Sequence, residues 1–226
     1  MANISVGKDS TSFNEEIKKI RANLKFSSIN GDVKVVCVTS SLPSEGKSLI
    51  AANLAASFAQ YDEKVLLIDC DLRKGRQRQL FNIQSEKEVG LSKLLINKRW
   101  ENEYTKYIKP TKIDNLSVIP TGLYPPNPSE LLANERFARL IHKLKEEYSM
   151  IILDCPPLEG LNDTLVVSSI ADTTILVAKY KQTPIKLLEK SKKALDTVGT
   201  RIAGVVLNHV EDEPNTYYYG YYEQSW

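Results

Sequence analysis

Short apolar runs that alternate with longer helical segments constrain the fold of this chain most strongly. Most of the runs are near-continuous valine, isoleucine and leucine, without the apolar–polar alternation of a half-exposed strand. Such runs are typical of parallel strands covered on both faces, and their alternation with helices indicates an α/β fold. The expected strands are residues 33–40, 64–71, 115–120, 149–157, 172–180 and 203–210, and the expected helices between them are 48–59, 129–148 and 184–198.

The first strand leads into a phosphate-binding motif. Residues 41–48, SLPSEGKS, match G-x-x-x-x-G-K-[ST] except that Ser41 replaces the first glycine and must accept the turn that glycine usually makes. Backbone N–H groups of such a loop surround a phosphate, and the N-terminus of the following helix adds its positive dipole end. A chance match is the competing explanation, but the strand before the loop and the helix after it favour a nucleotide site. The expected nucleotide-binding residues are Ser44, Glu45, Gly46, Lys47, Ser48 and Leu49.

Aspartates follow two further apolar runs. Asp69 and Asp71 follow one run, and Asp154 follows another. Each alone is also typical of a turn or a helix cap, but parallel strands end at one edge of a sheet, where all of them would meet the phosphate loop. Since Mg²⁺ prefers oxygen ligands, we expect Ser48, Asp71 and Asp154 to hold it. The sequence therefore predicts one α/β P-loop NTPase domain over residues 1–210, with a mainly parallel sheet flanked by helices on both faces, that binds ATP and Mg²⁺.

The composition mainly excludes classes of protein. The net charge of +2 is too small to indicate a nucleic-acid partner. No segment approaches the ~20 apolar residues that span a bilayer, and the N-terminus lacks the apolar core of a signal peptide, so we expect a cytoplasmic protein. The three cysteines, Cys37, Cys70 and Cys155, lie in or beside apolar runs, where buried reduced thiols are expected rather than a disulfide or a metal site.

The two ends of the chain differ from this core. Residues 13–26 predict a charged amphipathic helix before the first strand. Residues 211–226 begin with acidic side chains and end in a cluster of tyrosines, with no aliphatic residues to hold them against a core. We expect this tail to be mobile.

These motifs resemble the bacterial tyrosine kinase (BY-kinase) family of capsular and exopolysaccharide synthesis, in the stand-alone form found in Firmicutes. The resemblance covers nearly the whole chain. Besides the phosphate loop it rests on residues 68–73 (IDCDLR), 154–157 (DCPP), 90–92 (GLS) and 125–132 (PPNPSELL). A C-terminal tyrosine cluster completes it, here Tyr217, Tyr218, Tyr219, Tyr221 and Tyr222.

The resemblance implies that the γ-phosphoryl group of ATP passes to tail tyrosines of a neighbouring subunit. Lys47 would contact the β- and γ-phosphates, and Asp71 and Asp154 would serve the metal. A tyrosine hydroxyl has a pKa near ~10 and needs a proton acceptor, for which we choose Asp69, although the division of roles between Asp69 and Asp71 stays open. Asn208 lies at a strand end whose residues contact adenine in related folds, and it is a further nucleotide-binding candidate.

The resemblance also implies partners. Family members carry E-x-x-R-x-x-R on the first helix, which docks on a neighbour to build a ring, commonly an octamer. Here the corresponding residues are Glu15, Lys18 and Arg21, and lysine cannot make the forked contact of arginine with a carboxylate. A solvated charged surface is the alternative for this helix. Further expected partners are a membrane adaptor that holds the protein at the membrane periphery and activates it, and a cognate tyrosine phosphatase.

Two other functions compete with a kinase. The first is a Min/Par-type ATPase switch, whose members usually carry a lysine where this chain has Leu42. The second is a nucleotide-binding regulatory module without kinase activity, which would not need Lys47, Asp69 and Asp154 together. The tail, in turn, could be an aromatic adhesive segment rather than a substrate. Phosphotyrosine formation in the presence of ATP separates these functions.

Overall fold

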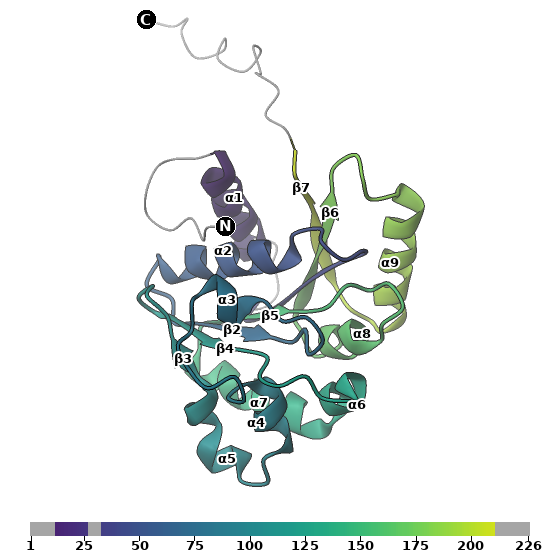
Figure 1. The fold of residues 1–226 in the computed structure, drawn as a ribbon. Coiled ribbons are helices and arrows are strands. Elements are labelled where there is room, and N and C mark those ends of the chain that lie inside the picture. The colour runs from purple at the N-terminus through teal and green to yellow at the C-terminus, as the bar shows by residue number, and fades with distance from the viewer. Residues whose placement is uncertain (1–11, 27–32, 211–226) are drawn as a thin grey trace, which may run out of the picture.

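The computed structural model describes residues 12–26 and 33–210, so the tail at 211–226 and its tyrosines lie outside the described residues (Figure 1). Its centre is a seven-stranded sheet of order β3-β4-β2-β5-β1-β6-β7, in which only β3 runs antiparallel to its neighbour. The strands are β1 (Val35–Ser40), β2 (Val65–Asp69), β3 (Lys109–Pro110), β4 (Leu116–Ile119), β5 (Met150–Asp154), β6 (Thr173–Lys179) and β7 (Ile202–Asn208).

Helices cover both faces of the sheet (Figure 1). One face carries α1 (Ser12–Phe26), α2 (Lys47–Ala59) and α3 (Gln77–Leu80). The other carries α4 (Leu91–Ile96), α5 (Trp100–Glu103), the 3-10 turn η1 (Tyr104–Tyr107), α6 (Pro128–Ala133), α7 (Glu135–Glu147) and α8 (Asp163–Ser168), with α9 (Ile185–Thr197) beside α8. None of the helices formed by the described residues is long and apolar enough to cross a bilayer.

The central strands contribute side chains to two hydrophobic cores, one on each face of the sheet. Val35 and Cys37 face the core under α4 to α8, while Val36 and Val38 face the core under α2. Because successive side chains of a strand point to opposite faces, a strand buried on both faces must be apolar at every position. This confirms the expected parallel α/β fold and explains the near-continuous apolar runs.

Helix α2 is buried on nearly all sides because it lies between the sheet and α1. Its alanines let it pack closely between the two layers, and Ile50, Leu54 and Phe58 fill the space around them. Helix α1 places Ile17 and Leu24 against it and leaves its charged face exposed.

The helix expected at 129–148 is two helices. Asn134 adopts an extended backbone between α6 and α7, and its side chain accepts a hydrogen bond from the Arg136 N–H, so it caps α7. Strand β3 was not predicted, because two residues carry no periodic pattern.

Candidate nucleotide-binding and phosphotransfer site

The loop between β1 and α2 is shaped to bind an anion. Ser44 and Gly46 have left-handed backbone angles, with φ of 65° and 95°. A Cβ on Gly46 would lie 2.0 Å from the Asn208 side-chain nitrogen, so only glycine fits there. Within the described part of the chain, no backbone N–H from Ser44 to Ser48 has a hydrogen-bond acceptor. Five free donors at a helix N-terminus fit a phosphate.

Ser41 does not make the turn that its position in the motif suggested. Its backbone is not left-handed; that conformation falls on Ser44 instead. The buried Ser41 hydroxyl accepts a hydrogen bond of 2.8 Å from Ser191 on α9, which holds the base of the loop. Serine therefore serves at this position without strain.

Lys47 lies among the predicted carboxylates. Its Nζ atom is 3.0 Å from Asp71 Oδ2 and 3.5 Å from Asp154 Oδ1. Burial by itself would lower the pKa of Lys47, but the charges of Asp154 and Asp71 raise that pKa above its ordinary value. Lys47 therefore stays charged and neutralises the carboxylates until a nucleotide arrives.

Asp69 lies deeper than Asp71. It is 1% exposed and accepts hydrogen bonds from the backbone N–H of Gln77 at 2.9 Å and of Asp71 at 3.3 Å. A Cβ on Gly75 would come within 2.7 Å of its carboxylate, so the loop closes directly over it. Burial and the charge of Asp154 raise the pKa of Asp69 to about 8.

Asp154 offers an oxygen that fits a metal ion. Among the described residues, its buried Oδ1 atom has no hydrogen-bond donor, while Oδ2 accepts one of 2.8 Å from Gln77. Ser48 follows Lys47 in the first turn of α2, and its hydroxyl accepts a hydrogen bond of 3.3 Å from Lys47 Nζ, the group that also pairs with Asp154. Ser48, Asp71 and Asp154 carry hard oxygen atoms of the kind that Mg²⁺ prefers.

Two side chains at this site, Gln77 and Asp163, were not identified from the sequence. Gln77 joins the ends of β5 and α2, because its amide donates both to Asp154 and to the Ser48 carbonyl at 3.0 Å. Arg73 pairs with the fully buried Asp163 at 2.9 Å, and the Ser129 hydroxyl donates to the same carboxylate. These partners are far apart in the sequence, so no local pattern marks them.

The site opens into a cavity of about 540 Å³. Of the predicted residues, Ser44, Gly46, Lys47, Ser48, Leu49 and Asp71 line it. Glu45 turns inward instead: it accepts from the Leu42 N–H at 2.8 Å and contacts the Thr183 hydroxyl. Asn208 donates to the Glu45 carbonyl at 2.9 Å, on the β7 side of the loop. The remaining lining residues are Pro43, Arg73, Lys74, Arg76, Leu80, Pro156, Pro157, Glu159 and Leu161.

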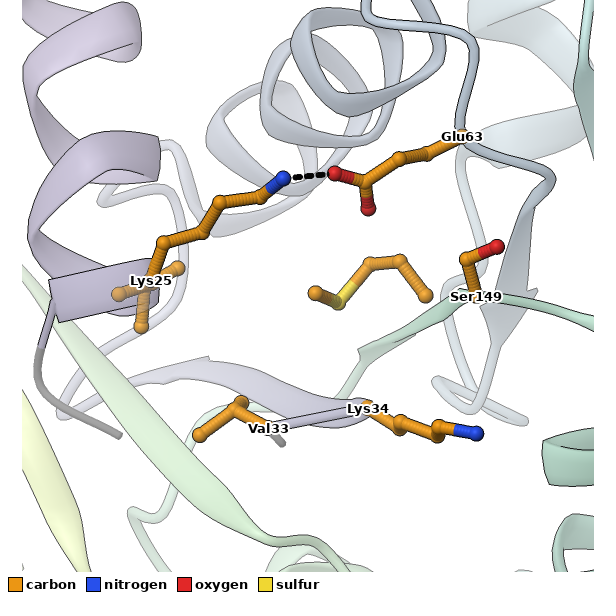
Figure 2. A pocket seen from close by; sticks show the side chains of 7 residues that line it. Lys25, Val33, Lys34, Glu63 and Ser149 are labelled. Atoms are coloured by element: carbon orange, nitrogen blue, oxygen red, sulfur yellow. Dashed lines mark hydrogen bonds and ion pairs between the residues drawn. The ribbon is translucent and has the colours of Figure 1, made fainter. Parts of the chain in front are cut away.

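A second cavity, of about 410 Å³, lies at the opposite edge of the sheet, where the strands begin (Figure 2). Lys25 of α1 pairs across it with Glu63, and Val33, Lys34 and Ser149 form its floor and side. None of the predicted site residues lines it.

The residues expected to build a ring lie on α1. Glu15 and Lys18 are exposed and pair with each other at 2.7 Å. Arg21 contacts its own chain: it donates to the Ser57 carbonyl at 3.1 Å and stacks 3.3 Å from the Tyr61 ring centroid. Arg21 therefore fastens α1 to α2.

The comparisons with known proteins agree with this geometry. A family model described as an AAA domain matches residues 33–203. The chain is 35% identical to "Putative tyrosine-protein kinase CapB" of Staphylococcus aureus, over 96% of this chain and 93% of that protein. It is 36% identical to "Tyrosine-protein kinase YwqD" of Bacillus subtilis, over 92% of this chain and 85% of the relative. "Tyrosine-protein kinase wzc" of Salmonella typhimurium is 38% identical, but this chain covers only 30% of its length.

Solved structures show the same fold. The chimeric protein CapA2B2 superimposes with a TM-score of 0.85 at 33% identity, over 92% of this chain and 90% of that chain. The kinase domain of Escherichia coli tyrosine kinase ETK gives a TM-score of 0.83 at 34% identity, over 94% and 82%. MinD of Pyrococcus horikoshii, solved with Mg-ADP, shares the fold alone, at 23% identity and a TM-score of 0.63 over 77% and 69%. The chain therefore belongs to the bacterial tyrosine kinase family.

Proposed function

We propose that this protein is an ATP-dependent tyrosine kinase that phosphorylates the tyrosine cluster of its own C-terminal tail and acts in capsular or exopolysaccharide synthesis. The observation that carries the proposal is the buried group of Lys47, Asp71 and Asp154 beside free loop amides. Phosphoryl transfer depends on positioning and charge stabilisation, which such a group supplies. The kinases CapB and YwqD, matched over most of their lengths, support it.

In the proposed reaction the tyrosine oxygen attacks the γ-phosphorus and forms a new O–P bond. The bond from the γ-phosphorus to the bridging oxygen breaks, and ADP leaves with the electron pair. Loop amides of Ser44 to Ser48 and the Lys47 ammonium hold the β- and γ-phosphates. Ser48, Asp71 and Asp154 would hold Mg²⁺, which would add charge stabilisation there.

The phenolic proton goes to the pair formed by Asp69 and Asp71. Asp71 lines the cavity, while Asp69 accepts the Asp71 backbone N–H directly beneath it. A raised pKa of about 8 suits a group that takes up a proton near neutral pH. The pH–rate profiles of Asp69→Asn and Asp71→Asn identify which aspartate accepts the proton. The lower limb of the profile should disappear only in the variant that lacks the proton acceptor.

We further propose that transfer runs between neighbouring copies. Strand β7, from which the tail continues, is four strand positions from β2, or about 19 Å at ~4.8 Å per step. From residue 210 to Tyr217 the chain spans at most about 25 Å. The first tail tyrosine must therefore use about three quarters of its maximal reach to arrive at the end of β2 in its own chain, whereas a neighbour's tail has no such limit.

The proposed assembly is a ring, built through the exposed Glu15 and Lys18 of α1 and activated by a membrane adaptor. The chimeric construction of the similar protein CapA2B2 is consistent with a kinase of this kind working with a second chain. Phosphates added to the tail carry about −1.5 to −2 charges each and would weaken the ring by repulsion. A cognate phosphatase would reverse this step.

The test is incubation of the protein with ATP and Mg²⁺, with an adaptor peptide in a parallel sample, followed by phosphotyrosine and ADP measurement. Lys47→Met is the control, since methionine fills a similar volume without the charge. We expect phosphotyrosine in the native protein and none in the variant. ADP release without phosphotyrosine in both samples would instead indicate an ATPase switch.

A further inference from the structure

The lining of the cavity extends beyond the phosphate loop. Its inner part is the loop with Lys47 and Ser48, and it continues past Asp71 to the segments that follow β2 and β5. In the sheet order both of these strands lie on the side of β1 away from β7. This extension therefore begins where the γ-phosphate would lie and points away from Asn208.

The walls of the extension are apolar. Leu80 of α3 lines it, as do Pro156, Pro157 and Leu161 from the segment after β5. Except for the buried Pro156, these side chains are half-buried. A slot between leucine and proline side chains suits a flat aromatic ring, whose hydroxyl would then point toward Asp71.

The rim of the extension is basic. Lys74 and Arg76 are exposed, and neither has a carboxylate within ion-pair distance in the described part of the chain. Arg73 differs, because Asp163 already binds its guanidinium. Glu159 stands on the rim as well and opposes this charge.

The tail of the chain carries the complementary charge. Residues 211–226 contain Glu211, Asp212, Glu213 and Glu223 and no lysine, arginine or histidine. The acidic triplet precedes Tyr217 by a few residues, so it would lie at the rim when that tyrosine enters the slot.

We propose that this extension is the acceptor subsite and that it selects tyrosines preceded by acidic residues: Leu80, Pro157 and Leu161 hold the ring, and Lys74 and Arg76 bind the acidic residues. The inference rests on the proposed function, because it names the substrate class of the same site. Its occupant is the tail of a second copy of this chain.

The experiment uses the full-length chain with excess Mg-ADP and a fluorescent peptide of residues 211–226, read by anisotropy. Loss of two exposed charge contacts should raise the dissociation constant of the peptide about tenfold. We expect K74E/R76E to weaken peptide binding about tenfold and Glu159→Gln to strengthen it. K98E/R99E makes the same change of charge on exposed residues outside the cavity and serves as the matched control.

A charge-exchange variant adds a kinetic readout. In K74E/R76E, replacing the tail triplet by lysine (E211K/D212K/E213K) should restore the rate of tail phosphorylation at saturating ATP. Unchanged peptide binding and an unchanged rate in K74E/R76E would overturn the inference, while phosphotyrosine formation in the native protein would still support the kinase. Absence of phosphotyrosine in every variant, with peptide binding still weakened in K74E/R76E, would reject the kinase and keep the peptide site.

Discussion

The side-chain amide of Gln77 donates a hydrogen bond of 2.8 Å to Asp154 Oδ2 and another of 3.0 Å to the Ser48 carbonyl. One buried side chain thus fixes the end of β5 relative to the first turn of α2. Asp154 and Ser48 are two of the proposed magnesium ligands, so Gln77 orients the metal site without binding the metal. Groups of this kind keep a ligand in the geometry that the metal needs.

Replacing Gln77 by leucine should weaken magnesium binding about 10- to 100-fold, the usual range for loss of a residue that orients a metal ligand. The measurement is the Mg²⁺ dependence of ADP binding, followed with a fluorescent ADP analogue. Gln79→Leu is the matched control, because Gln79 lies two positions away on the same short helix but is exposed. Equal magnesium affinities in the two variants would show that Gln77 does not orient the site.

Asp69 should make the ligand-free protein less stable as the pH rises. Its pKa is 3.8 in the unfolded reference and about 8 in the folded chain. Between these values the folded state binds more protons, so the free energy of unfolding falls with pH, by at most about 1.4 kcal/mol per pH unit. Urea titrations from pH 5 to pH 8 should show Asp69→Asn gaining stability relative to the native protein as the pH rises. Asp114→Asn, at an exposed position, should follow the native curve; the same result for Asp69→Asn would contradict the prediction.

The pair of Arg73 and Asp163 should be structural. Among the described residues, Arg73→Ala leaves the fully buried Asp163 carboxylate with only the Ser129 hydroxyl. This should cost about 2 kcal/mol of unfolding free energy, a value reduced for the partial exposure of Arg73. Adding Asp163→Asn should recover part of this loss, because the unpaired charge is removed. Urea denaturation measures both, with Arg99→Ala, at an exposed position, as the control. A double variant less stable than the sum of the two single changes would contradict this account.

Transfer between copies can be separated from transfer within one chain by mixing two variants. One carries Lys47→Met with an intact tail, and the other has an intact site with phenylalanine at Tyr217, Tyr218, Tyr219, Tyr221 and Tyr222. Phosphotyrosine in the mixture, and in neither protein alone, is the expected result. If the mixture stays unlabelled while the native protein is labelled, transfer occurs within one chain.

Much of the fold followed from local patterns. Every expected strand and the helices at 48–59 and 184–198 are present with slightly different ends, because burial on both faces leaves an apolar run that is visible in the sequence. The break at Asn134 escaped prediction, since the apolar spacing continues across it and only the backbone shows that the asparagine caps a new helix. Strand β3 is too short for any pattern.

The site was predictable where a residue belongs to a sequence motif or follows an apolar strand. The phosphate loop and Asp71 follow from spacing, and the structure brings them to one cavity. Gln77 and Asp163 were missed because their partners lie 77 and 90 residues away along the chain. The different depths of Asp69 and Asp71 also arise from tertiary structure, since Gly75 covers one and not the other.

The central claim is that the site around Lys47 transfers phosphate from ATP to tail tyrosines. Mass spectrometry of the full-length protein after incubation with Mg-ATP and the adaptor peptide tests it most directly, with Lys47→Met treated in parallel. The account predicts phosphate on tyrosines within residues 211–226 of the native protein and none in the variant. ATP consumption that leaves those residues unmodified, or equal modification of the Lys47→Met protein, would contradict it.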